Sequence, residues 1–174
     1  LAPYTGTVDG VDVSGLGTFE YARIRTPQAL TRRPVPARFK LPLDFFTYQI
    51  INLDEHTQVL LTDVRARGRT ACRLAHVRVL GRETEVYDDV HFAVIEYGEP
   101  LVDDRGNTMR RPIRFKWSVR DGGDEVLALI GNVDSPWRLG HGPGYVAAYS
   151  YAGTWRTSAV SGSAYVEWID VQPD

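Results

Sequence analysis

Apolar and polar residues alternate along most of this chain, which is the pattern of β-strands with one buried face. Segment 113–120 alternates strictly, with Ile, Phe, Trp and Val at the odd positions and Arg, Lys or Ser at the even positions. The glycine-containing turn 121–124 and the apolar run 125–133 follow, so these segments predict a hairpin. By the same reasoning, further strands are expected over 45–53, 58–65, 71–80 and 86–97.

The beginning of the chain is repeated near its end. The motif Y-x-G-T-x5-V-S-G-x3-[FV]-E-[YW] starts at Tyr4 and again at Tyr151, 147 residues later. Its spaced glycines and alternating apolar positions predict a strand–turn–strand unit. A chain that begins and ends with the same kind of hairpin suggests a closed antiparallel sheet whose interior can hold a ligand.

The rest of the sequence favours a fold made almost entirely of strands, because no long window has the period of a helix. Segments 98–111 and 134–143 are rich in turn residues and are expected to be loops. Segment 26–42 contains four prolines and is expected to be a linker or a strap. We therefore predict an all-β fold with little helix, an antiparallel up-and-down barrel of about eight to ten strands, with a sandwich as the alternative.

The length of 174 residues suits one domain rather than two. We expect a single barrel domain over 1–174. In this division, 1–25 is an opening hairpin, 26–42 is the linker or strap, and 43–174 is the main barrel.

The composition narrows the range of functions. The formal charge is −2 with no basic run, so no nucleic-acid partner is expected. No apolar stretch approaches the roughly 18 residues that span a bilayer, so no membrane span is expected. Cys72 is the one cysteine and the four histidines are scattered, which predicts no disulfide and no metal site. Arginine far outnumbers lysine, as in GC-rich bacterial genomes, and residues 1–4 lack signal-peptide features, so we expect a bacterial, cytoplasmic protein.

Two segments resemble a known family. The end of the chain carries G-x-G-Y at 142–145 and V-x-G-x-x-Y-V-E at 160–167, and resembles the closing hairpin of calycin-type barrels. It is similar to the carotenoid 1,2-hydratase (hydroxyneurosporene synthase) and related lipocalin-like family. The motif F-x-Y-Q-I-x-N-L at 46–53, followed by Leu60 and Leu61, resembles the opening of a barrel of that family.

The resemblance implies a fold, a ligand class and a kind of chemistry. It implies a cavity for an isoprenoid-like apolar molecule, with hydration, isomerisation or cyclisation by acid–base catalysis. Members of that family generally contain two barrels in tandem, whereas this chain has about one and a fraction. Segment 5–24 therefore either closes a first barrel that is otherwise missing or opens a complete single barrel. We expect the second arrangement, because a lone hairpin is marginally stable.

The candidate catalytic residues are Glu167, His91 and Tyr48. Glu167 and Glu20 occupy equivalent places in the repeat, and a carboxyl group inside an apolar barrel would have a raised pKa and could protonate a substrate. The period of a strand places Glu167 opposite Val166 and Trp168, so an outward orientation is the alternative. His91 stands beside two aspartates, an arrangement found in acid–base sites and also in structural histidines.

The candidate ligand-binding residues are aromatic. Three tyrosines share one face of their strand. If that face lines the cavity, their hydroxyl groups could orient a ligand; the alternative is that the tyrosines cover an outer face. The full set is Tyr145, Tyr149, Tyr151, Trp117, Phe115, Trp168 and Phe46.

The leading functional hypothesis is a small-molecule enzyme, a hydratase, isomerase or cyclase. It would act by acid–base chemistry on an apolar, isoprenoid- or polyketide-like substrate inside the barrel, with no cofactor. Two alternatives stay open. The protein could carry a hydrophobic molecule without reacting with it, or it could be a binding or structural β domain whose barrel is filled by side chains.

Overall fold

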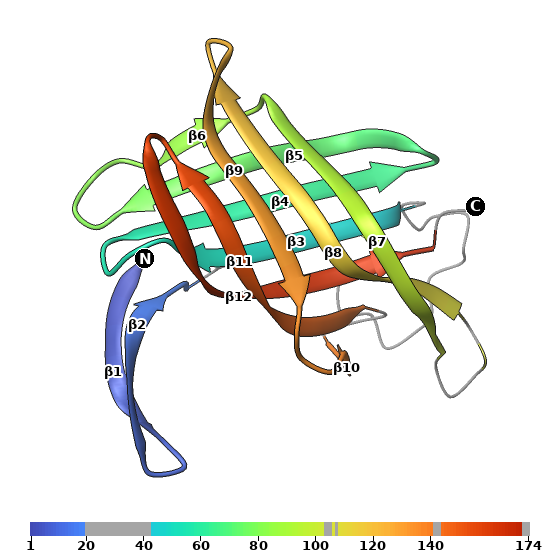
Figure 1. The fold of residues 1–174 in the computed structure, drawn as a ribbon, viewed down its shortest axis with the longest axis horizontal. Helices are drawn as coiled ribbons and strands as arrows, with labels where there is room; N and C mark the ends of the chain where they lie inside the picture. Colours follow the sequence, from blue (N-terminus) through green and yellow to red (C-terminus); the bar gives the residue numbers. More distant parts are fainter. Residues whose placement is uncertain (20–42, 103–105, 107, 141–143, 172–174) are drawn as a thin grey trace, which may run out of the picture.

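The computed structural model describes residues 1–19, 43–102, 106, 108–140 and 144–171, which form strands, turns and short connections. The all-β prediction is confirmed (Figure 1). No helix capable of spanning a bilayer occurs in this part of the chain. The strands are β1 (Ala2–Val8), β2 (Val11–Gly17), β3 (Leu43–Asn52), β4 (Thr57–Ala66), β5 (Arg69–Val79), β6 (Glu85–Tyr87), β7 (Val90–Val102), β8 (Thr108–Asp121), β9 (Asp124–Val133), β10 (Arg138–Leu139), β11 (Tyr145–Trp155) and β12 (Ser158–Asp170).

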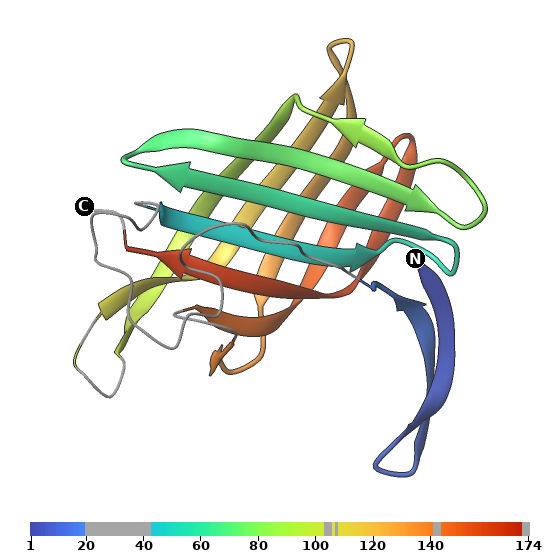
Figure 2. The same ribbon diagram turned by 180° about the vertical axis from the view of Figure 1, so that it is seen from behind.

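Ten of these strands form one antiparallel sheet with the order β6-β5-β4-β3-β12-β11-β9-β8-β7, and β10 pairs with β11. Neighbours in the chain are mostly neighbours in the sheet, and the pairing of β3 with β12 joins the two ends of the meander. The sheet curls so that one group of strands crosses the other (Figures 1 and 2). Among the described residues, no ladder pairs β6 with β7, so the barrel stays open between these two consecutive strands.

Two predicted boundaries differ from the structure. The expected strand 86–97 is divided, because the chain changes direction at Asp88 and Asp89, where the Val90 amide donates to the Asp88 carbonyl. The expected loop 98–111 is mostly strand, since β7 continues to Val102 and β8 begins at Thr108. Pro100 is compatible with β7 because β7 is an edge strand, and the register shifts between Gly98 and Leu101.

The sequence repeat is also a structural repeat. Tyr4 lies opposite Gly15 in the hairpin β1–β2, and Tyr151 lies opposite Gly162 in the hairpin β11–β12. In both hairpins the tyrosine packs on the glycine: a Cβ atom would lie 3.1 Å from the hydroxyl of Tyr4 at Gly15, and 3.0 Å from that of Tyr151 at Gly162. The motif therefore encodes one hairpin geometry twice.

The first hairpin forms a two-stranded sheet of its own, beside the turn between β3 and β4. It is attached through the backbone carbonyl of Leu16, which accepts hydrogen bonds from the side-chain amides of Asn52 and Gln58, both 3.3 Å long, and through the Thr18 hydroxyl, which donates to Oε1 of Gln58. Leu16 is buried, whereas Tyr4 and most of β1 are exposed. The predicted linker 26–42 lies outside the described residues.

Packed aromatic rings occupy the middle of the barrel. Phe92 and Trp117 have ring centroids 4.5 Å apart, and Phe115 contacts Tyr149 edge to face at 4.9 Å. Phe45 meets Trp168 edge to face at 5.0 Å. Because these rings fill the centre, the site available for chemistry lies toward an end of the barrel.

Candidate functional site

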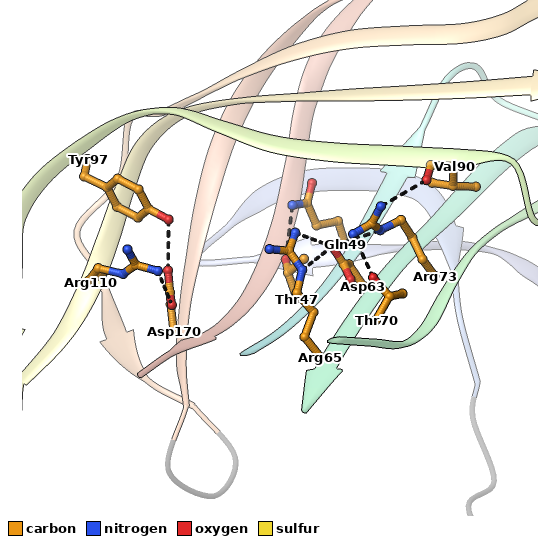
Figure 3. A network of polar contacts seen from close by, with 10 residues as sticks. All are labelled: Thr47, Gln49, Asp63, Arg65, Thr70, Arg73, Val90, Tyr97, Arg110 and Asp170. Carbon is orange, nitrogen blue, oxygen red and sulfur yellow. Dashed lines mark hydrogen bonds and ion pairs between the residues drawn. The ribbon is translucent and has the colours of Figure 1, made fainter. Parts of the chain in front are cut away.

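A group of charged and polar side chains lies on the inward face at the end of the barrel where β3 and β5 begin and β4 and β12 end (Figure 3). The sheet register explains how they meet. Thr47, Asp63 and Arg73 are directly opposite one another on β3, β4 and β5. Phe45 stands between Asp170 on β12 and Arg65 on β4. We call this group the polar end; its members are Thr47, Gln49, Asp63, Arg65, Arg73, Tyr97, Arg110 and Asp170.

Asp63 is fully buried and is held by two arginines. Arg65 donates to its Oδ2 from Nη2 at 2.7 Å and from Nε at 3.1 Å. The Nε of Arg73 lies 3.1 Å from the same oxygen. The other carboxylate oxygen, Oδ1, is buried without a hydrogen-bond partner among the described residues. It is therefore an acceptor available to a water molecule or a ligand hydroxyl group.

Asp170 is the second fully buried carboxylate. Tyr97 donates its hydroxyl to Oδ2 at 3.0 Å, and Arg110 donates from Nη2 to Oδ1 at 2.9 Å. The indole N–H of Trp168 donates to the backbone carbonyl of Arg110 at 2.8 Å, which fixes the start of β8 against β12. The Arg110 guanidinium also lies 4.9 Å from the centre of the Tyr97 ring.

The environment of Tyr97 keeps its hydroxyl group protonated at neutral pH. Burial raises the pKa of Tyr97 to about 12, with a further contribution from the neighbouring charge of Asp170. Arg110 and Arg65 act in the opposite direction and lower this pKa. Arg65 therefore connects the two halves of the polar end, because it pairs with Asp63 and also acts on Tyr97.

This environment predicts an alkaline limit to stability. The folded protein holds the Tyr97 proton more tightly than the unfolded chain does, so stability should fall as the pH rises from about 10 to about 12. In the Asp170→Asn variant the pKa of Tyr97 should move down, because a negative neighbour is removed. NMR titration of ¹³Cζ-labelled tyrosine would measure this. A pKa of Tyr97 that is unchanged in the variant would contradict the assigned role of Asp170.

A short hydrogen-bond chain leads from the polar end into the core. Tyr149 donates its hydroxyl to Oε1 of Gln49 at 2.7 Å, and the Gln49 amide donates to Oγ1 of Thr47 at 3.2 Å. Burial raises the pKa of Tyr149 well above its usual value. All three side chains are buried, so this series of hydrogen bonds fixes one arrangement of the polar groups near the two aspartates.

The three predicted catalytic residues lie elsewhere. Glu167 and Tyr48 are direct neighbours across β12 and β3, on the side opposite the buried Val166 and Trp168, and Glu167 accepts a hydrogen bond from Tyr165 at 3.0 Å. His91 is 63% exposed on β7, and its Nε2 lies 3.2 Å from Oδ1 of Asp89. The structure thus brings Glu167 and Tyr48 together on the outer face and leaves His91 apart. Glu20 lies outside the described residues.

Most of the predicted ligand-binding residues face inward. Tyr149, Trp117, Phe115 and Trp168 belong to the aromatic core, and Tyr151 donates its hydroxyl to the Asn52 carbonyl at 2.7 Å. Phe46 and Tyr145 line a small cleft of about 20 Å³ together with Glu167 and Trp168. That volume is enough for one or two water molecules.

Sequence reasoning missed both buried aspartates, although a signal was present. Asp170 continues the inward series of Val166 and Trp168 at a spacing of two residues, and Asp63 continues the series of Val59 and Leu61. A carboxylate on the inward face of an otherwise apolar strand is rare and indicates a special environment. In the described part of the chain, no three His, Cys, Asp or Glu side chains are grouped so that they could hold a metal ion.

These features define an antiparallel β-barrel with a charged group at one end of its interior. The crystal structure of kievitone hydratase from Nectria haematococca is similar, with a TM-score of 0.56 and 16% sequence identity. The match covers 74% of this chain and 40% of that chain, so the chain spans less than half of the length of that protein. At this level of identity the likeness shows the fold, which is calycin-like.

The family is shown by a second comparison. The chain belongs to a family of unknown function, DUF6670, whose model matches residues 1–174. No curated protein gives a significant match. The calycin-like fold expected from the hairpin motifs is thus confirmed, and the relation to the carotenoid 1,2-hydratase family stays a prediction.

Proposed function

We propose that this protein is an acid–base enzyme of the hydratase type, acting on a double bond of a small, mainly apolar molecule at the polar end. The observation that carries the proposal is the pair of fully buried carboxylates, Asp63 and Asp170, beside the aromatic rings of Phe45 and Trp168. Burying an ionisable group costs free energy of folding, and such groups are concentrated at catalytic sites. The similar fold of a hydratase supports the same reaction class.

The two carboxylates suit two different roles: Asp63 would be the base that takes a proton from water, and Asp170 would hold the hydroxyl of Tyr97, the proposed acid. A water molecule that donates to Oδ1 of Asp63 would be oriented by a group that the protein leaves unpaired. As a C–O bond forms to one carbon, an O–H bond of this water breaks and its proton passes to Asp63. The other carbon takes a proton from the hydroxyl of Tyr97, which recovers it from Asp63 through solvent. Water is added overall, and the reverse path removes it.

The proposal is tested by following water into a product. The protein is incubated in oxygen-18 water with a panel of prenylated phenols and isoprenoid alcohols, and mass spectrometry detects labelled products. Wild-type protein should form a labelled product from at least one compound. Asp63→Asn should lower the turnover about 100-fold or more, because it removes the proposed base. Asp170→Asn should also lower the turnover, because it removes the carboxylate that holds the Tyr97 hydroxyl in place. Circular dichroism establishes that each variant is folded.

Asp124→Asn is the matched control, because Asp124 is exposed at the turn between β8 and β9. It should leave turnover unchanged. Glu167→Gln and His91→Gln test the catalytic roles predicted from the sequence. Loss of turnover in these variants, with activity retained in Asp63→Asn, would refute the polar end as the reaction site. Binding of a panel compound without any labelled product would identify a carrier instead.

The substrate class expected from the resemblance, an isoprenoid- or polyketide-like molecule, stays part of the proposal. Its apolar frame would lie over the exposed part of the Tyr97 ring, because Phe45 and Trp168 are buried in the aromatic core. The polar end is open to solvent at Tyr97, which is 41% exposed, and at the side chain of Arg110, which is 31% exposed. A substrate would approach by the same route.

A further inference from the structure

Arg65 lies where the charged group meets the aromatic rings. Its guanidinium carbon is 4.3 Å from the centre of the Phe45 ring. Two of its nitrogens, Nε and Nη2, bind Asp63. The guanidinium plane is therefore fixed by a carboxylate at one edge and by a ring on one face. The Nη1 nitrogen takes part in neither bond to Asp63, and the Arg65 side chain as a whole is 23% exposed.

The charge around Asp63 is not balanced. Arg65 and Arg73 share a single oxygen of one carboxylate, which leaves one positive charge in excess within this group. The two arginines differ in what else they bind. Arg73 donates to Oγ1 of Thr70 at 3.2 Å and to the Val90 carbonyl at 3.5 Å, so its terminal nitrogens are engaged by the protein. Arg65 is thus the better placed of the two to bind an external anion.

We propose that the substrate carries an anionic oxygen, a carboxylate or a phenolate, beside its apolar part, and that Arg65 binds this oxygen. The inference rests on the proposed function and names the substrate class of that site. Arginine binds carboxylates and phenolates strongly because its planar donors match the acceptor geometry.

Two probes that share one frame and differ in charge test this inference. Naphthalene-2-carboxylate is anionic at neutral pH, and naphthalene-2-carboxamide is its neutral counterpart. The carboxylate should bind about tenfold more tightly to the wild-type protein, measured by calorimetry, since one charge-assisted hydrogen bond is gained. High salt should weaken the binding of the carboxylate and leave that of the carboxamide unchanged.

Arg65→Gln should abolish the preference for the carboxylate. Arg120→Gln is the matched control, because Arg120 is exposed at the far end of β8. Equal affinity of the two probes for the wild-type protein, absence of binding of both, or a preference that persists in Arg65→Gln would each overturn the inference. The salt dependence tests for a charge contribution to binding with the wild-type protein alone, so that the test does not depend on the variant being folded. Tighter binding of the carboxylate without oxygen-18 incorporation would support this inference and reject the proposed reaction. Turnover of neutral compounds alone would support the proposed reaction and reject this inference.

Discussion

Replacing Gly153 by alanine is expected to destabilise the barrel by about 3 kcal/mol or more. A Cβ atom at Gly153 would lie 1.9 Å from the backbone carbonyl oxygen of Ala128 and 2.9 Å from the Cα of Leu129. These are backbone atoms of β9, the strand that pairs with β11, so a rotamer change cannot relieve the clash. The ladder between the two strands must shift. For a domain of this size the melting temperature should fall by about 6–12 °C.

The repeat supplies a matched control for this variant. Gly6 is the counterpart of Gly153 in the first hairpin, and a Cβ atom there would meet no atom within 4 Å. Gly6→Ala should change stability by about 0.5 kcal/mol or less. Thermal unfolding followed by circular dichroism measures both variants. Equal effects at the two positions would show that β11 and β9 are not packed as described.

The fold was predictable because its signals are local. Alternation in 113–120 and 125–133, with the turn between them, is enough to define β8, β9 and their pairing. The edge position of β7 was not predictable in this way, since it depends on which strands meet when the sheet curls. For that reason the sequence places Pro100 in a loop, although an edge strand can contain a proline.

The candidate site depends on contacts that no local pattern encodes. Thr47, Asp63 and Arg73 meet through two hairpin registers, which turn lengths restrict. Asp170 meets Arg110 and Tyr97 across the barrel, at separations of 60 and 73 residues along the chain. Inward-facing carboxylates can be found from the period of a strand, but their partners depend on the curvature of the whole sheet.

Replacing Trp168 by alanine is expected to cost about 3–5 kcal/mol, because the side chain is fully buried and its loss leaves a cavity beside Phe45 and Phe92. Phe19→Ala is the control, since Phe19 is 87% exposed and should be nearly neutral. Thermal unfolding measures both variants. A small effect of Trp168→Ala would contradict the packed aromatic centre.

The Trp168→Phe variant separates the contribution of ring packing from the contribution of the hydrogen bond that positions Arg110. Phenylalanine keeps most of the ring contacts but leaves the Arg110 carbonyl without the indole donor, which should cost about 1 kcal/mol. Because this bond fixes Arg110, which in turn holds Asp170, the larger effect should appear in catalysis. We expect a turnover that falls by more than the loss of stability explains, with the variant still folded at the assay temperature. Turnover equal to wild type would show that the bond from Trp168 does not position Arg110.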